Sequence, residues 1–185
     1  MTHFEYVAAA HTLLLTFAAA RILAGVFNAL QPQKLYWVHL SWVSLAIMLC
    51  LASFWIFWGF REVEWTLPRL VRLLAAPVLI YGFSSMVVPA SSSDIESWRD
   101  YFFAERIPIF GSGLLMIASI IFAGTLSGLS ALDPLNFPLY ALLVVFAAGL
   151  ASDRPALHSA LALVPPLVAA AILFGPVAEP NWSAP

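Results

Sequence analysis

The 185-residue chain is poor in charged residues, in lysine and in cysteine, and each shortage excludes a class of protein. Only 10% of its residues are charged, whereas ordinary soluble domains have about 25%. Hydrophobic residues make up 62%, and the mean hydropathy is +0.92. A water-soluble fold of this size has no means of burying so much apolar surface, so the surrounding solvent must be lipid. The net charge of -2 gives no basis for a nucleic-acid partner.

The single cysteine and the single lysine exclude further classes. Cys50 has no second cysteine with which to form a disulfide or a metal site, and we expect it to pack as a small apolar residue. Lys34 follows a proline-containing turn outside the apolar runs, which excludes a retinal Schiff base within a helix. The chain also has no HExxH, GxSxG or glycine-rich phosphate-loop motif, and we expect a protein that is not an enzyme.

Long apolar runs predict an all-α bundle of six transmembrane helices in one integral membrane domain covering residues 1–185. Runs of about 20 apolar residues are long enough to cross a bilayer. The expected spans are residues 6–30, 36–60, 67–88, 107–126, 134–152 and 156–177. Residues 94–106 mix charged and aromatic side chains, which favours a helix lying at the membrane interface. The adjacent prolines Pro165 and Pro166 are expected to break or bend the last span.

Arg21 is the strongest functional signal, because it places a permanent charge near the middle of the first apolar run. Such a charge costs roughly 2.5–3.5 kcal/mol on insertion scales, and no acidic residue lies deep in a span to compensate it. Arg21 could donate to backbone carbonyls or to hydroxyls such as Ser44 and Tyr81, and Asn28 lies on the same side of its helix. Two interpretations remain open: a lock for the helix bundle, and a ligand site in which Arg21, Asn28, Tyr81 and Ser44 hold an anion or a lipid phosphate.

Two histidines within the first two spans suggest a possible pigment site. His11 or His39 could each ligate a haem or a chlorophyll, since neutral imidazole binds such metals. The two helices run antiparallel, which places these histidines near opposite faces of the membrane and excludes a shared axial pair. The alternative is that each is a hydrogen-bonded histidine between helices. His158, at the start of the last span, is expected to be solvated.

Several segments of the chain resemble a family of uncharacterised bacterial multi-pass membrane proteins. The segments are RILAG, LYWVHLSW, FWIFWGFREVEWT and WRDYFFAER, which together span roughly residues 18–106. The resemblance implies a helical bundle in the bacterial cytoplasmic (inner) membrane. It assigns no function and no site residue.

Three functional classes follow from these observations. The first is a non-catalytic membrane subunit or helper that packs with membrane lipid, pigment, partner proteins or further copies of itself, through the small-residue surfaces of its helices. The second is a small transporter or channel for a neutral or anionic solute, with Arg21 as the anion contact. The third is a haem- or chlorophyll-binding membrane protein that uses His11 or His39.

Overall fold

The computed structural model describes residues 2–32, 34–91, 94–130, 132–133 and 136–175, and their regular structure is entirely helical. The helices are α1 (His3–Ala29), α2 (Trp37–Ile56), η1 (Phe57–Phe60), α3 (Leu67–Val87), α4 (Trp98–Ala104), α5 (Arg106–Gly124), η3 (Thr125–Ser127), α6 (Phe137–Ala151), α7 (Pro155–Leu161) and α8 (Val164–Phe174).

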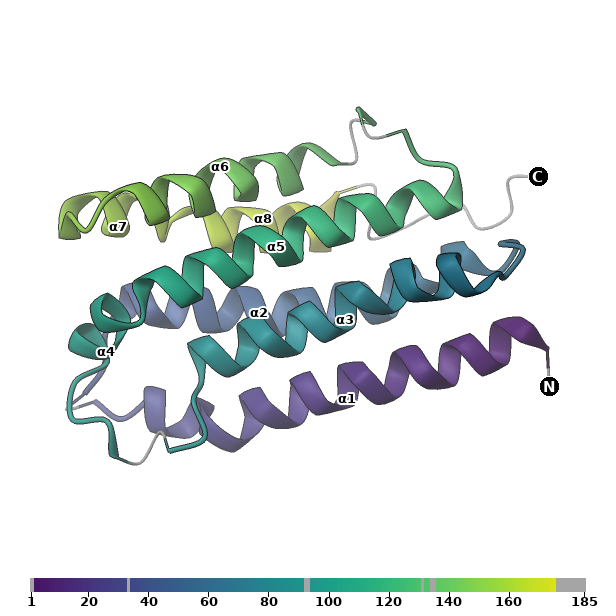
Figure 1. Cartoon of the computed structure of the whole chain (residues 1–185). Coiled ribbons are helices and arrows are strands. Elements are labelled where there is room, and N and C mark those ends of the chain that lie inside the picture. Colours follow the sequence, from purple (N-terminus) through teal and green to yellow (C-terminus); the bar gives the residue numbers. More distant parts are fainter. Residues whose placement is uncertain (1, 33, 92–93, 131, 134–135, 176–185) are drawn as a thin grey trace.

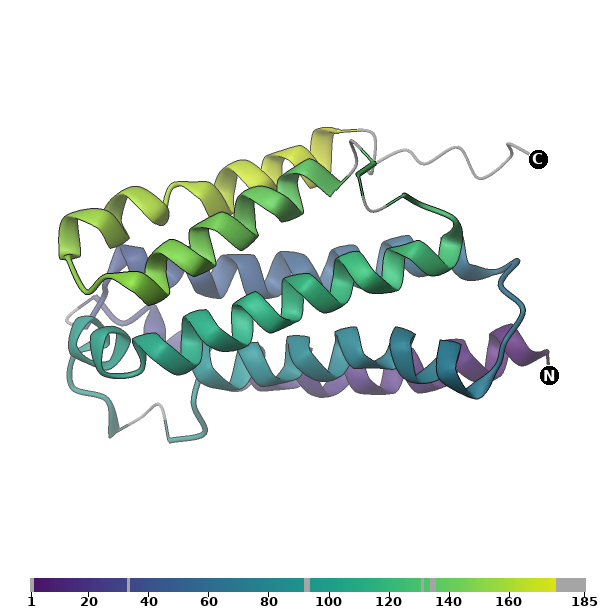
Figure 2. The ribbon, with the colours of Figure 1, turned by 45° about the horizontal axis from the view of Figure 1, so that its top comes forward.

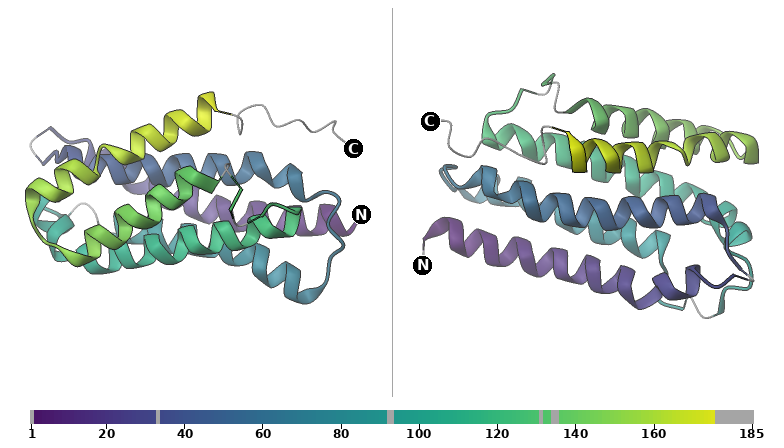
Figure 3. Two further views of the ribbon diagram at one scale, coloured as in Figure 1. Left: turned by 90° about the horizontal axis from the view of Figure 1, so that it is seen from above. Right: turned by 180° about the vertical axis from the view of Figure 1, so that it is seen from behind.

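The long helices lie side by side and form an elongated bundle (Figure 1). The chain runs back and forth along the bundle, so that α1 and α3 run in the same direction and α2 runs against both (Figure 3). The short helix α4 lies across one end, between the end of α3 and the start of α5 (Figure 2). We refer to this as the α4 end. The start of α1 lies at the opposite end, and α8 runs from the α4 end toward it (Figure 1).

Five helices are long and apolar enough to cross a membrane, which confirms the prediction of a helical membrane bundle in its general form. They are His3–Ala29, Trp37–Phe60, Leu67–Val87, Arg106–Gly124 and Pro155–Phe174. The fifth predicted span corresponds to α6, which is apolar but has only 15 residues in Phe137–Ala151. The start of that predicted span, residues 134 and 135, lies outside the described residues, as do the last two residues of the sixth.

The helix across the end of the bundle is shorter than predicted. The sequence pattern predicted a helix over residues 94–106, whereas α4 begins at Trp98. Ser97 is its N-cap, because the Ser97 hydroxyl accepts a hydrogen bond from the backbone N–H of Asp100 at 3.3 Å. Glu105 leaves helical geometry and separates α4 from α5, so Arg106 belongs to the first turn of α5.

The proline pair breaks the last helix as predicted. The structure has two helices there, α7 and α8, with the prolines in the first turn of α8. In a continuous helix the carbonyl of Ala162 would accept a hydrogen bond from residue 166, but Pro166 has no N–H to donate. The hydroxyl of Ser41 on α2 donates to this carbonyl at 2.5 Å and satisfies it. The break is therefore joined to a neighbouring helix instead of facing lipid with an unpaired carbonyl.

The centre of the bundle is filled by aromatic rings that pack against glycines. The ring of Trp42 on α2 lies edge-on to Phe110 of α5, with centroids 4.9 Å apart, and 5.3 Å from Phe146 of α6. Phe146 lies directly against Gly113, and Phe110 lies directly against Gly149, so a methyl group at either glycine would overlap a ring. The two glycines allow α5 and α6 to approach each other closely, as small residues do in membrane helices.

Candidate functional site at the α4 end

Helix α4 is joined to α1 and α3 by two side chains that donate to backbone carbonyls. The indole N–H of Trp98 donates to the carbonyl of Asn28 at 3.1 Å, and the hydroxyl of Tyr101 donates to the carbonyl of Met86 at 2.6 Å. Trp98 and Tyr101 are one helical turn apart, so Asn28 and Met86 lie at nearly the same level of the bundle. Because α1 and α3 run in the same direction, this level sets the register between them (Figure 1).

With this register, Arg21 of α1 lies at the depth of Leu79 in α3. Arg21 is seven residues before Asn28, about 10 Å deeper at 1.5 Å per residue. The residue of α3 at the same depth is Leu79, and Tyr81 lies two residues further toward α4. The structure therefore places Arg21 and Tyr81 at similar depths, which is the first requirement for the predicted site.

The Arg21 side chain is half-buried and incompletely satisfied. Its Nε atom is buried and has no hydrogen-bond partner. Arg21 lies close enough to Tyr101 of α4 to act on its phenol group electrostatically. The pKa of Tyr101 is raised to about 12, chiefly by burial and also by the negative charge of Glu105, while the positive charge of Arg21 opposes the shift. The Tyr101 hydroxyl is thus a neutral donor at physiological pH.

Two residues of α3 with hydroxyl groups, Tyr81 and Ser85, lie between the depth of Arg21 and helix α4. Tyr81 is 44% exposed, at the rim of the surface. Ser85 is one turn further along the same face of α3, and its hydroxyl is buried without a hydrogen-bond partner. We use the name α1–α3 groove for the surface along which α1 and α3 pack side by side, where Arg21, Tyr81 and Ser85 lie, with Tyr101 of α4 at its end. Arg21 and Tyr81 were identified from the sequence, whereas Ser85 and Tyr101 were not.

The other two residues of the predicted ligand site have separate contacts. The amide oxygen of Asn28 accepts a hydrogen bond from the side chain of Gln31 at 3.3 Å, and the Asn28 carbonyl binds Trp98. Ser44 lies on the exposed face of α2, where its hydroxyl donates to the carbonyl of Ser41 at 2.7 Å. Neither side chain belongs to the α1–α3 groove as defined here.

His11 is buried between α1 and α2 near the end opposite α4. Its Nε2 atom lies 3.4 Å from the hydroxyl of Ser53, and its ring stacks on Phe57 with centroids 4.6 Å apart. The side chain is only 3% exposed. These contacts are those of a histidine between helices, the alternative to a pigment ligand in the sequence analysis.

His39 is completely buried beneath α4, and aromatic side chains surround it. Its ring stacks on Trp98 with centroids 4.6 Å apart and meets Tyr101 edge-on at 6.0 Å. Neither ring nitrogen has a hydrogen bond of ordinary geometry, although the backbone of Val87 lies near the ring. A pigment at His39 would have to displace Trp98, which also joins α4 to α1. The two histidines lie at opposite ends of the hairpin, as antiparallel helices require.

His158 is buried rather than solvated, so the expectation for this residue was wrong. Its side chain is 0% exposed and is enclosed by Phe102, Phe103 and Phe110. Its Nε2 atom lies 2.8 Å from the carbonyl of Ser152, to which it donates. The reason is that α4 folds over the start of α7, a contact between segments far apart in the sequence.

Arg106 holds the end of α6, and no sequence motif had pointed to this role. Its Nη1 atom donates to the carbonyls of Gly149, Leu150 and Ser152 at 2.9, 2.7 and 3.0 Å. Gly149 and Leu150 lie in the last turn of α6 and Ser152 is its C-cap, where helices leave carbonyl acceptors unpaired and favour positive charge. Arg106 from α5 is therefore a C-terminal cap for α6.

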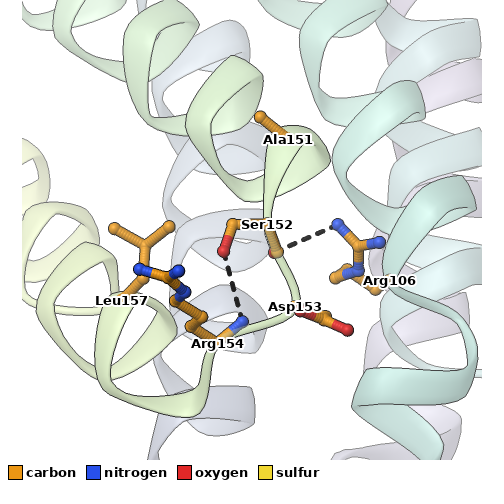
Figure 4. Close-up of a pocket in the computed structure, with 6 residues that line it drawn as sticks. All are labelled: Arg106, Ala151, Ser152, Asp153, Arg154 and Leu157. Atoms are coloured by element: carbon orange, nitrogen blue, oxygen red, sulfur yellow. Dashed lines mark hydrogen bonds between the residues drawn. The ribbon is translucent and has the colours of Figure 1, made fainter.

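The turn that Arg106 holds also borders a shallow polar pocket of about 740 Å³ (Figure 4). The pocket is lined by Arg106, Ala151, Ser152, Asp153, Arg154 and Leu157. The guanidinium groups of Arg106 and Arg154 lie on opposite sides of the turn, with that of Arg154 directed toward Leu157 (Figure 4). The two arginines therefore do not converge on one anion, and the pocket is a weaker candidate for a phosphate site than the α1–α3 groove.

Comparison of the chain with protein-family models, with curated proteins and with solved structures gave no match.

Proposed function

We propose that the protein is a non-catalytic integral membrane protein, a subunit or helper that acts through its outer surface on lipid and partner proteins. The observation that carries this proposal is the interlocked interior: Trp42, Phe110 and Phe146 fill the space between α2, α5 and α6, and two of these rings lie against glycines. Such packing favours a rigid support, because packed cores resist continuous deformation.

The proposed membrane placement has six crossings, with α4 at the interface. Helix α6 rises about 22 Å at 1.5 Å per residue, which is less than the hydrocarbon thickness of about 30 Å. Local thinning of the bilayer accommodates a short span at modest cost. Helix α4 buries Trp98 and Phe102 and exposes Arg99 and Asp100, as an interfacial helix does. The resemblance to bacterial membrane proteins supports placement in a bacterial inner membrane.

The surface available to partners is apolar and extends along the outer helices. Leu23 on α1 is 63% exposed and Leu115 on α5 is 62% exposed. In a bilayer this surface contacts acyl chains, and a partner helix can replace them without a hydrophobic penalty, so close packing decides the association.

Site-specific photo-crosslinking in native membranes tests the proposal. A photoreactive residue replaces Leu23 in one variant and Leu115 in another, and the buried Phe83 is replaced in a control variant. We expect a discrete protein adduct from at least one exposed position and none from position 83. Adducts with lipid alone at both exposed positions would contradict the partner-binding role.

A second candidate, the small anion transporter, is favoured by the unpaired Nε of Arg21. It is tested separately by measuring anion flux into liposomes that contain the purified wild type or the Arg21→Gln variant. Flux that depends on Arg21 would replace the helper proposal with the transporter. Equal leakage with both proteins and with empty liposomes would end the transporter proposal.

A further inference from the structure

We propose that the α1–α3 groove binds the phosphate group of a phospholipid, with Arg21 as the charged contact and Tyr81 and Ser85 as hydroxyl donors. This inference rests on the proposed function only in placing α1 and α3 within a bilayer. It assigns to one defined place on the surface a ligand of defined chemistry, a phosphate ester attached to acyl chains.

The hydroxyl donors Tyr81 and Ser85 lie on the side of α3 that faces away from α5. The guanidinium of Arg72 lies 4.6 Å from the ring centroid of Phe122, so α5 occupies the side of α3 that carries Arg72. Tyr81 follows Arg72 by two and a half turns and therefore points away from α5, and Ser85 shares the face of Tyr81. This leaves both hydroxyls on the part of α3 that borders α1 and lipid.

Tyr101 of α4 interacts with both helices that border the groove. Its hydroxyl is bound to the carbonyl of Met86 on α3, and its phenol group interacts electrostatically with Arg21 on α1. Arg21 therefore lies within the electrostatic range of a group fixed on α3. The groove is covered by α4 at the end of the bundle and is open to lipid at Tyr81, which is 44% exposed.

The charge of Arg21 has no carboxylate partner in the described part of the chain. Within the described part of the chain, Arg21 forms no ion pair, and its buried Nε lacks a hydrogen-bond acceptor. Glu105 is the carboxylate that acts on the same phenol group as Arg21, yet no ion pair joins Glu105 to Arg21. A guanidinium in contact with acyl chains requires a counter-charge, and a phosphate oxygen suits its planar fork of donors.

The test is a lipid titration of the purified full chain followed by native mass spectrometry. The probe is phosphatidylglycerol, and diacylglycerol serves as a matched lipid that lacks the phosphate. We expect the wild type to bind phosphatidylglycerol at least about tenfold more tightly than diacylglycerol, as one charged hydrogen bond provides. Arg21→Gln should reduce the affinity for phosphatidylglycerol to nearly that for diacylglycerol. Equal binding of both lipids by the wild type would overturn the proposal.

The matched control is Arg154→Gln, which removes an exposed guanidinium from the same end of the bundle. It should leave the affinity for phosphatidylglycerol within about twofold of the wild type, because Arg154 lies outside the groove. An equal loss in both variants would show attraction by general charge and would overturn the site. Tyr81→Phe removes one hydroxyl and keeps the ring, so it tests the groove even if Arg21→Gln fails to fold. Unchanged phosphatidylglycerol binding by Tyr81→Phe would show that Tyr81 is not part of the site and would overturn the proposed set of contacts.

Inorganic phosphate distinguishes a lipid from a soluble anion. We expect inorganic phosphate in large molar excess to leave phosphatidylglycerol bound, because the lipid reaches the groove through the bilayer. Displacement by inorganic phosphate would assign the groove to a free anion and overturn the lipid proposal. If the protein crosslinks are retained but the lipid selectivity is absent, the lipid site is wrong and the proposed function stands. If the lipid selectivity is present but the protein crosslinks are absent, the proposed function is wrong and the lipid site stands.

Discussion

Both ends of the bundle have ring contacts, but at the α4 end side chains also donate to backbone carbonyls of neighbouring helices. At the α4 end Arg106, Trp98 and Tyr101 each bind a carbonyl of a different helix. At the opposite end Phe4 stacks on Phe57 with centroids 5.2 Å apart, and Arg72 lies over Phe122.

This difference reflects how helix ends are stabilised in lipid. Apolar packing alone gives little driving force between helices there, because acyl chains are as apolar as leucine side chains. Hydrogen bonds to the carbonyls of helix ends therefore contribute more to stability in lipid than ring contacts do. The comparison predicts unequal losses when equivalent groups are removed from the two ends.

Replacing Arg106 should give the largest loss of stability. Arg106→Met leaves the carbonyls of Gly149, Leu150 and Ser152 without this donor, and we expect the free energy of unfolding to fall by about 3 kcal/mol. Thermal unfolding in mild detergent measures the change. The control Arg154→Met removes an exposed arginine and should change stability by less than about 0.5 kcal/mol. Equal effects would show that the carbonyl bonds do not stabilise the α4 end.

Overfilling the contact between α5 and α6 should give the next largest loss. In Gly113→Ala the new methyl group overlaps the ring of Phe146, and we expect a cost of about 1–3 kcal/mol. Gly111 on the same helix has no atom near the position of an added methyl group, so Gly111→Ala should be neutral or stabilising. Unfolding in detergent at a series of denaturant concentrations compares the two. Similar losses would indicate that α5 moves away from α6 without cost.

The sequence was sufficient to predict the helices but not the contacts between their ends. Hydrophobic runs located the long helices, and the proline pair located the break between α7 and α8, because both are local properties. Ser97, with Asp100 three residues later, is a local capping pattern that would have placed the start of α4 correctly. The α4 helix was predicted too long because charged residues continue on both sides of it.

The candidate site was predicted only in part, for a physical reason. Arg21 was recognisable because a charge in an apolar run is costly, and Tyr81 because it is a polar side chain in a span. Tyr101 and His158 acquire their partners because α4 folds over segments far away in the sequence. Burial of this kind depends on tertiary contacts, so hydropathy and spacing do not report it.

The ring contact at the opposite end should contribute less than the bonds of Arg106. In Arg72→Met the apolar stem is largely retained and the cation over Phe122 is lost, so we expect about 1 kcal/mol. Phe122→Leu removes the other partner, and the double variant should show that the two losses are not additive. A loss for Arg72→Met larger than that for Arg106→Met would reverse the comparison of the two ends.

Alkaline pH should destabilise the folded protein at the α4 end, and this is the smallest of the four expected effects. The pKa of Tyr101 is raised to about 12 in the folded protein, above its ordinary value of 10.0, chiefly because of burial. The unfolded chain therefore loses this proton first, and stability falls as the pH rises from about 10 to about 12. The loss is absent below pH 10, where Tyr101 is protonated in both states. Thermal unfolding across this pH range should show a smaller decline for Tyr101→Phe than for the wild type, since phenylalanine has no proton to release. Equal declines would show that other groups, and not the Tyr101 bond to Met86, set the alkaline limit of the α4 end.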